Sequence, residues 1–143
     1  LREIANSIGS SSTVASLDVL VTGDKFEIRS APGKDFSDLV RSAEENGAGE
    51  LLVQDVFADG TKSGPNLGLA REVLSVTDLP VMFGGGVSSL DQAKQLWGMG
   101  IGAVAAGAWF VFKGPHDAIL VTYPSRKKIA EAISAVELPK LGL

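Results

Sequence analysis

The sequence contains no cysteine and only one histidine, His116, among its 143 residues. Without cysteine the chain forms no disulfide bond and offers no thiolate for catalysis, a composition that fits a cytoplasmic protein. A single histidine among scattered carboxylates does not make the ligand set that a zinc site needs. We therefore expect a cytoplasmic protein that works without a bound metal or cofactor.

Basic residues are also few. The 13 Lys and Arg are outnumbered by 17 Asp and Glu, which gives a net charge of −4 and a pI near 4.9. No basic stripe could neutralise phosphodiesters, so nucleic acid is not an expected partner. No apolar run reaches the roughly 18 residues of a membrane helix, so we expect no membrane insertion. The start, Leu1 to Ile4, has no apolar signal region and no Met, and we interpret it as an interior starting point or a terminus whose tag is not shown.

Strand-like runs alternate with helical patterns along the chain. The strand-like runs are residues 13–21, 51–56, 79–83 and 103–106. The helical patterns are residues 35–46, 67–76, 88–99 and 125–136, with residues 1–8 as the tail of a preceding helix and residues 23–34 as a loop. Such alternation is typical of βαβ units and a parallel sheet. We expect one α/β domain over residues 1–143, with four βα units over residues 13–143.

Two glycine-containing turns follow the third and fourth predicted strands. Gly84, Gly85 and Gly86 precede a helix that opens with serines and an acid at Asp91, and Ala106, Gly107 and Ala108 follow the last strand. Small residues let the backbone approach a ligand, and their N–H groups beside a helix start form an anion cradle. In a (βα)8 barrel, the loops after strands seven and eight are the usual phosphate site. The two turns predict phosphate binding; flexible connections are the alternative.

A polar loop leaves the second predicted strand. Its residues are Asp59, Gly60, Thr61, Lys62, Ser63 and Gly64. The loop is longer and richer in glycine than a minimal turn, which suggests a mobile segment over a site. The alternative is an exposed connection in which Asp59 starts a turn.

Asp18 lies inside an apolar strand-like run, where a carboxylate faces solvent or belongs to a site. If Ser16 and Asp18 share the inward face of the sheet, Asp18 points into the mouth of a barrel, where a proton acceptor is useful. Asp55 is the second choice, because a register change of one residue would exchange the faces of the two carboxylates.

Three motifs together resemble the cyclase subunit of imidazole glycerol phosphate synthase. They are Gly47-Ala48-Gly49-Glu50, the loop from Asp59 to Gly64, and Gly85-Gly86-Val87-Ser88-Ser89-Leu90. The resemblance covers nearly the whole chain and implies the C-terminal (βα)4 half of a (βα)8 TIM barrel, equivalent to strands five to eight.

The resemblance also implies roles for residues. Asp18 matches one of the family's two catalytic aspartates, and Asp59 is a second expected catalytic residue, on a loop that closes over the site. The glycine turns hold one of two substrate phosphates. The implied reaction uses ammonia from a glutamine amidotransferase partner to form imidazole glycerol phosphate from a phosphoribulosyl substrate. The chain departs from the cyclase pattern at Gln54, where a small hydroxyl residue is usual, and at Ala108, where serine is usual.

Other segments resemble different branches of the family. Residues 110–114, His116 and residues 123–126 are similar to homologues of surface-polysaccharide pathways that make acetamidino sugars. Residues 63–67 and 87–91 are equally similar to the sister phosphoribosyl isomerase. Cyclisation, sugar amidination and isomerisation therefore remain alternatives, as does a non-catalytic phosphate-binding half-barrel that serves in assembly.

A half-barrel exposes strand edges, here expected at residues 13–21 and 103–106, and an uncovered sheet face. We therefore expect a homodimer or higher even oligomer, or a complementary half-barrel, rather than a monomer.

Overall fold

The computed structural model describes residues 1–114 and 116–136, so the end of the predicted domain, residues 137–143, lies outside the described residues. Its strands are β1 (Val14–Thr22), β2 (Lys25–Ile28), β3 (Glu50–Asp55), β4 (Val81–Gly84), β5 (Ala103–Ala105), β6 (Phe112–Lys113) and β7 (Ala118–Ile119). Its α-helices are α1 (Arg2–Ile8), α2 (Phe36–Glu45), α3 (Leu67–Val76), α4 (Leu90–Met99), α5 (Ala108–Val111) and α6 (Arg126–Ser134). The predicted strands and helices are all present, with bounds that differ by no more than two residues.

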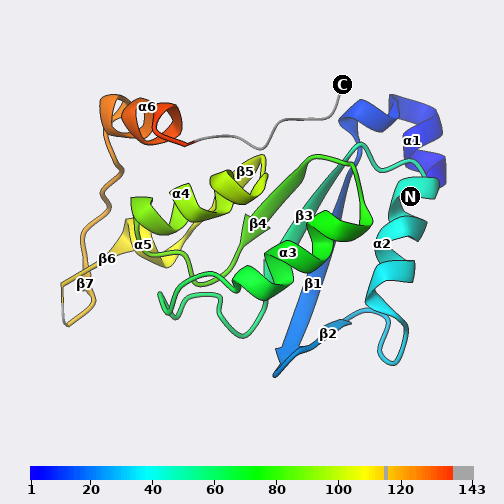
Figure 1. Cartoon of the computed structure of the whole chain (residues 1–143), viewed down its shortest axis with the longest axis horizontal. Helices are drawn as coiled ribbons and strands as arrows, with labels where there is room; N and C mark the ends of the chain where they lie inside the picture. Colours follow the sequence, from blue (N-terminus) through cyan, green and yellow to red (C-terminus); the bar gives the residue numbers. More distant parts are fainter. Residues whose placement is uncertain (115, 137–143) are drawn as a thin grey trace.

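Four strands form a parallel sheet, as the alternating pattern predicts. The strand order is β2-β1-β3-β4-β5, and the β1–β3, β3–β4 and β4–β5 pairs are parallel. Figure 1 shows helices following the strands in turn, with β6 and β7 forming a separate small hairpin before α6. The chain is thus an α/β protein built from parallel βα units.

Strand β2 corrects the prediction of a loop over residues 23–34. It pairs antiparallel with the end of β1, with Thr22 opposite Lys25. Only two residues join the strands, and Gly23 has a left-handed φ of 62°, which suits such a tight hairpin turn. The sequence signal is the alternation over Lys25–Ile28, which places Phe26 against Phe36 and buries Ile28.

Four helices begin at a capping side chain. The side chains of Asp35, Asn66, Ser89 and Ser125 each accept a hydrogen bond from the backbone N–H three residues later. Helix α4 starts later than its serines predict, because Ser89 is the cap. The side chain that reaches back is Gln92, whose Oε1 accepts from the N–H of Ser88 at 2.7 Å, whereas the acid Asp91 pairs with Lys94 on the surface.

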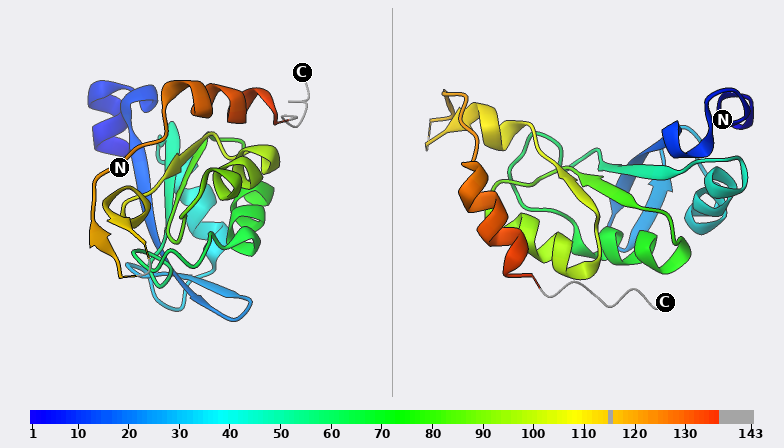
Figure 2. Two further views of the ribbon diagram at one scale, coloured as in Figure 1. Left: turned by 90° about the vertical axis from the view of Figure 1, so that its left-hand side faces the viewer. Right: turned by 90° about the horizontal axis from the view of Figure 1, so that it is seen from above.

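The two faces of the sheet differ. Ala15, Leu17 and Val19 of β1 are buried with residues of α2, α3 and α4 in one apolar core. Figure 2 shows α3 and α4 along this face, whereas the opposite face carries no helix over β3 and β4 in the described part of the chain. Val14 on that open face is 49% exposed, which is unusual for a strand of a parallel sheet.

Strand register aligns side chains into rows across the open face. Asp18 is the partner of Gln54, Gln54 of Gly84, and Gly84 of Ala105. Partners in neighbouring strands point to the same side of a sheet. Four strands therefore contribute to one row near their C-terminal ends, the edge at which α/β proteins bind ligands.

The same register decides between the two strand carboxylates. Asp55 is the partner of Val19, faces the helices and is 3% exposed. Its Oδ1 accepts hydrogen bonds from the N–H groups of Phe57 and Ala58, both at 3.1 Å, and so shapes the turn that leaves β3. Asp18 is exposed on the open face together with Ser16. Asp55, the second choice for a site carboxylate, is therefore a structural residue.

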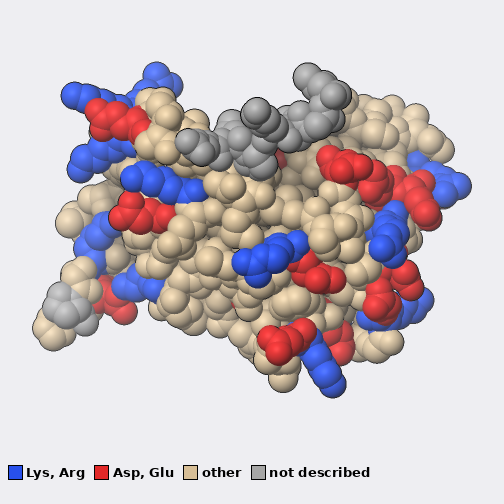
Figure 3. Space-filling model, in the orientation of Figure 1, with Lys and Arg blue, Asp and Glu red and all other residues tan. Residues whose placement is uncertain are grey.

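Charged side chains are distributed over the surface without a dominant sign. Figure 3 shows Lys and Arg in small groups interspersed with Asp and Glu, and no continuous basic stripe crosses the visible face. Among the helices of the described residues, none combines the length and apolarity needed to cross a membrane.

The contrast between Asp55 and Asp18 predicts different stability effects. Asp55→Ala removes the acceptor of two turn N–H groups, and a donor left without a partner costs about 1–3 kcal/mol. Asp18→Ala removes an exposed side chain, so the free energy of unfolding should change by less than about 0.5 kcal/mol. Urea denaturation of both variants measures the difference, and equal losses would contradict the assigned faces.

Candidate functional site

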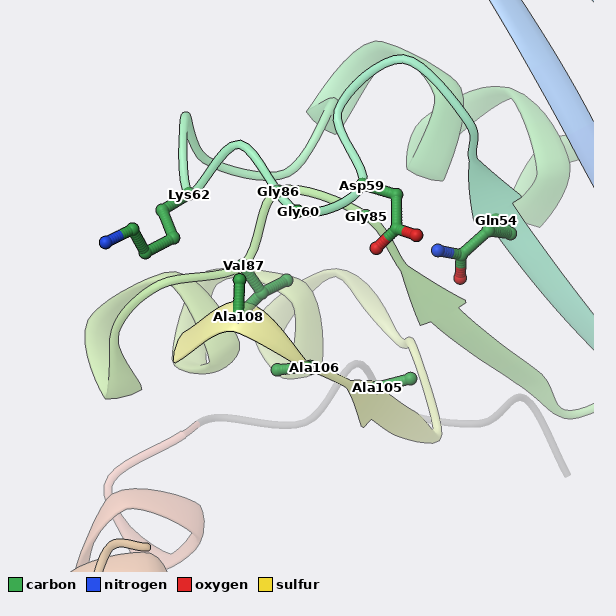
Figure 4. Close-up of a pocket in the computed structure, with 11 residues that line it drawn as sticks. Gln54, Asp59, Gly60, Lys62, Gly85, Gly86, Val87, Ala105, Ala106 and Ala108 are labelled. Atoms are coloured by element: carbon green, nitrogen blue, oxygen red, sulfur yellow. The ribbon is translucent and has the colours of Figure 1, made fainter. Parts of the chain in front are cut away.

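A cavity of about 150 Å³ lies at the C-terminal ends of β3, β4 and β5. Figure 4 shows the predicted glycine turns and the predicted polar loop meeting around it. Its lining residues are Gln54, Asp59, Gly60, Lys62, Gly85, Gly86, Val87, Ala105, Ala106, Gly107 and Ala108. The structure thus brings together three segments that the sequence identifies separately.

The first glycine turn is held by close backbone contacts. Gly85 and Gly86 have φ values of 103° and 76°, a region that side chains disfavour. A Cβ on Gly86 would lie 2.1 Å from the carbonyl oxygen of Gly64, and one on Gly85 would lie 2.6 Å from that of Asp55. Glycine is therefore required here for packing of the turn against the loop and the end of β3. Gly84 does not line the cavity and lies beneath the side chain of Gln54.

The second turn is open instead. Nothing lies within 4 Å of a Cβ built on Gly107, so this residue faces free space beside the cavity. Among the described residues, no acceptor pairs with the N–H groups of Gly86, Val87, Gly107 or Ala108. Unpaired N–H groups from two turns carry positive partial charge and suit an anion.

The loop from Asp59 to Gly64 is internally hydrogen-bonded. The Thr61 hydroxyl donates to the carbonyl of Ala58 at 2.7 Å and lies 2.7 Å from the Ser63 hydroxyl. The N–H of Gly64 donates to the carbonyl of Gly86 at 2.9 Å, which joins the loop to the first glycine turn. Asp59, Gly60 and Lys62 line the cavity, whereas Thr61 and Ser63 do not.

Lys62 links the loop to the β6–β7 hairpin. Its ammonium group forms an ion pair with Asp117, and both residues have a left-handed φ, 58° and 48°. Figure 4 shows the Lys62 side chain extending away from Asp59 and Gln54. The basic side chain therefore lies at the rim of the cavity, and the acidic Asp59 lies nearer the strand ends.

Asp18 lies outside this cavity. It lines a separate hollow with Ser16, Arg29 and Ser30, one strand away from Gln54. Sequence reasoning does not identify Gln54 or Val87 as site residues, although both line the cavity. The alternation along β3 predicts only that Gln54 shares a face with Leu52, and the register with β1 and β4 puts it in the row of Asp18 and Gly84.

The arrangement combines an anion cradle with a carboxylate. The N–H groups at the two turns can bind an anion without any charged side chain. Asp59 can accept or return a proton at the other end of the cavity. In the described part of the chain, no group of three His, Cys, Asp or Glu residues could hold a metal ion.

Comparison with known proteins identifies relatives. Residues 1–116 match the family model described as histidine biosynthesis protein. The chain is 35% identical over 133 residues to a putative imidazole glycerol phosphate synthase subunit HisF of Leptospira borgpetersenii, covering 87% of this chain and 52% of that protein. It is 34% identical over 137 residues to the subunit HisF of Exiguobacterium sibiricum, covering 92% and 53%. It is 30% identical over 140 residues to a putative subunit hisF2 of Pseudomonas aeruginosa, covering 90% and 54%.

The chain spans about half the length of these curated relatives. The family model covers the whole cavity, from Gln54 to Ala108. The resemblance found in the sequence motifs is thereby confirmed. The chain belongs to the histidine biosynthesis protein family.

Proposed function

We propose that the cavity binds the phosphate of a phosphorylated small-molecule substrate in a cyclase of the imidazole glycerol phosphate synthase type. One observation carries the proposal: Gly86, Val87, Gly107 and Ala108 all line one cavity, and no acceptor among the described residues pairs with their N–H groups. Backbone donors beside glycine turns are a general solution for phosphate. Because backbone atoms supply them, Ala108 in place of the serine usual in cyclases does not remove the cradle.

The side chains have distinct roles in this proposal. Asp59 accepts and returns protons at the end of the cavity where the reaction takes place. The hydrogen bond from Gly64 to Gly86 joins its loop to the turn that binds the phosphate. Asp18, on β1, faces the same side of the sheet as its partner Gln54 and supplies a second carboxylate. Ammonia comes from a glutamine amidotransferase partner, and the substrate is a phosphoribulosyl compound. No cofactor takes part.

We also propose that residues 1–143 form the C-terminal (βα)4 half of a (βα)8 barrel. The open face of the sheet supports this, because it carries the row of Asp18, Gln54, Gly84 and Ala105 that would line a barrel interior. Four more parallel strands would cover this face and complete the ring. They can belong to the same longer polypeptide, to another chain or to a second copy.

A second candidate function is amidination of a sugar in a surface-polysaccharide pathway. Of the residues that resemble that branch, Phe112 and Lys113 form β6, and His116 lies between β6 and β7 of the hairpin. The hairpin reaches the cavity rim through the ion pair of Asp117 with Lys62. A branch-specific segment at the rim would alter which substrate enters.

Phosphate binding can be tested with a charge at the open turn. We expect titration with inorganic phosphate to shift the amide resonances of Gly86, Val87, Gly107 and Ala108. Ala108→Glu should weaken binding at least about fivefold, because two like charges 4 Å apart repel by about 1 kcal/mol in bulk water and about 4 kcal/mol near a protein surface. Gly85 is a poor probe, since a side chain there would meet Asp55 and not the anion.

The charge-matched control is Gln95→Glu on the exposed side of α4. It should bind phosphate as the unchanged chain does. Amide shifts confined to other parts of the molecule, or equal binding by both glutamate variants, would refute the phosphate site.

The open face predicts self-association of the 143-residue chain. Strand β2 covers the end of β1 from Val19 to Thr22, so the edge available for pairing is shorter than the expected residues 13–21. The remaining edge over Val14–Leu17 and the face of Asp18 still need cover. Light scattering after size exclusion at micromolar concentration should show a dimer or higher even oligomer. A well-folded species of 14.8 kDa would contradict this.

A further inference from the structure

Gln54 lies between the two carboxylates of the proposed site. Its neighbours in the row across the open face are Asp18 on one side and Gly84 on the other. It lines the cavity together with Asp59, and besides Lys62 these are the polar side chains among the lining residues. A side chain in this position meets whatever part of a ligand extends from the phosphate toward Asp18.

The position of the Gln54 amide depends on Gly84. A Cβ added to Gly84 would lie 2.2 Å from Oε1 of Gln54 and 3.4 Å from the Cβ of Ala105. The amide thus occupies the space that a side chain at position 84 would take. The absence of that side chain gives the amide a defined place on the floor of the cavity.

The amide is available for a ligand. None of the described residues forms a hydrogen bond with the Gln54 side chain, which is only partly buried. Figure 4 shows the Gln54 amide and the Asp59 carboxylate pointing toward one another across the cavity. A carboxylate only accepts hydrogen bonds, whereas an amide both donates and accepts. A hydroxyl group between them can donate to Asp59 and accept from Gln54, and an alkyl group can do neither.

We propose that Gln54 is a specificity-determining residue that, with Asp59, selects phosphate esters carrying a hydroxyl group near the phosphate, the pattern of polyol and sugar phosphates. This inference rests on the proposed phosphate site, because it takes the anion to lie at the two glycine turns. It assigns the recognition of a hydroxyl group of that substrate to one side chain. It also gives a reason for an amide where cyclases usually carry a small hydroxyl residue.

Three probes separate selection from anion binding: inorganic phosphate, glycerol 3-phosphate and propyl phosphate, which lacks the hydroxyls. The chain should bind glycerol 3-phosphate about tenfold more tightly than propyl phosphate, the effect of one hydrogen bond to a charged group. Gln54→Met keeps the length of the side chain but removes its donor and acceptor. Its ratio of the two affinities should fall about threefold or more, the loss of one neutral hydrogen bond, while the inorganic phosphate affinity stays within about twofold of the original. Calorimetry or amide-shift titration measures all three.

Two further variants control the result. Gln95→Met makes the same change on the exposed side of α4 and should keep the tenfold ratio. Gly84→Ala leaves Gln54 in place but displaces the flexible end of its side chain, so it should lower the ratio as Gln54→Met does. If Gln54→Met fails to fold, the affinity ratio of Gly84→Ala tests the role of Gln54 in its place.

The outcomes are distinguishable. If no probe perturbs the cavity amides of the unchanged chain, the phosphate site fails, and the role of Gln54 fails with it. If inorganic phosphate binds there but glycerol 3-phosphate and propyl phosphate bind equally, the selectivity fails alone. If the tenfold ratio persists in Gln54→Met or Gly84→Ala, a residue other than Gln54 binds the hydroxyl group and the proposed role of Gln54 is wrong.

Discussion

The contact between the backbones of Gly64 and Gly86 is the constraint on which the cavity depends. The N–H of Gly64 donates to the carbonyl of Gly86, and a Cβ on Gly86 would lie 2.1 Å from the Gly64 carbonyl oxygen. This approach fixes the loop that carries Asp59 against the turn that offers N–H groups. Asp59 and the glycine turn thereby come from separate βα units yet line one cavity. A side chain at Gly86 would therefore push the loop and the turn apart.

Strand register is the second constraint. Side chains alternate between the two faces of the sheet along β1 and β3. Asp18 therefore lies on the open face and Asp55 faces the helices, although both aspartates interrupt apolar runs. Asp55 then serves the turn that begins the loop of Asp59. One carboxylate therefore shapes the turn that leaves β3, and the other stays exposed on the open face.

The sequence predicts the fold well where a pattern is local. The strands and helices follow from periodicity and from capping residues such as Asn66, because these effects act within a few residues. The glycine turns and the Asp59 loop are also predicted as site segments. Strand β2 is missed, because four residues after a tight turn resemble a loop. Gln54 is missed because its place depends on register with Asp18 and Gly84, which are far apart in the chain.

Backbone and side chains divide the work of the proposed site. A cradle of N–H groups tolerates substitutions such as Ala108, because the donors do not depend on the side chain present. Proton transfer and selection do depend on side chains, here Asp59, Asp18 and Gln54, each on a different segment. On the proposed roles, a change at Gln54 alters which phosphate ester is accepted while the anion stays bound to the backbone N–H groups.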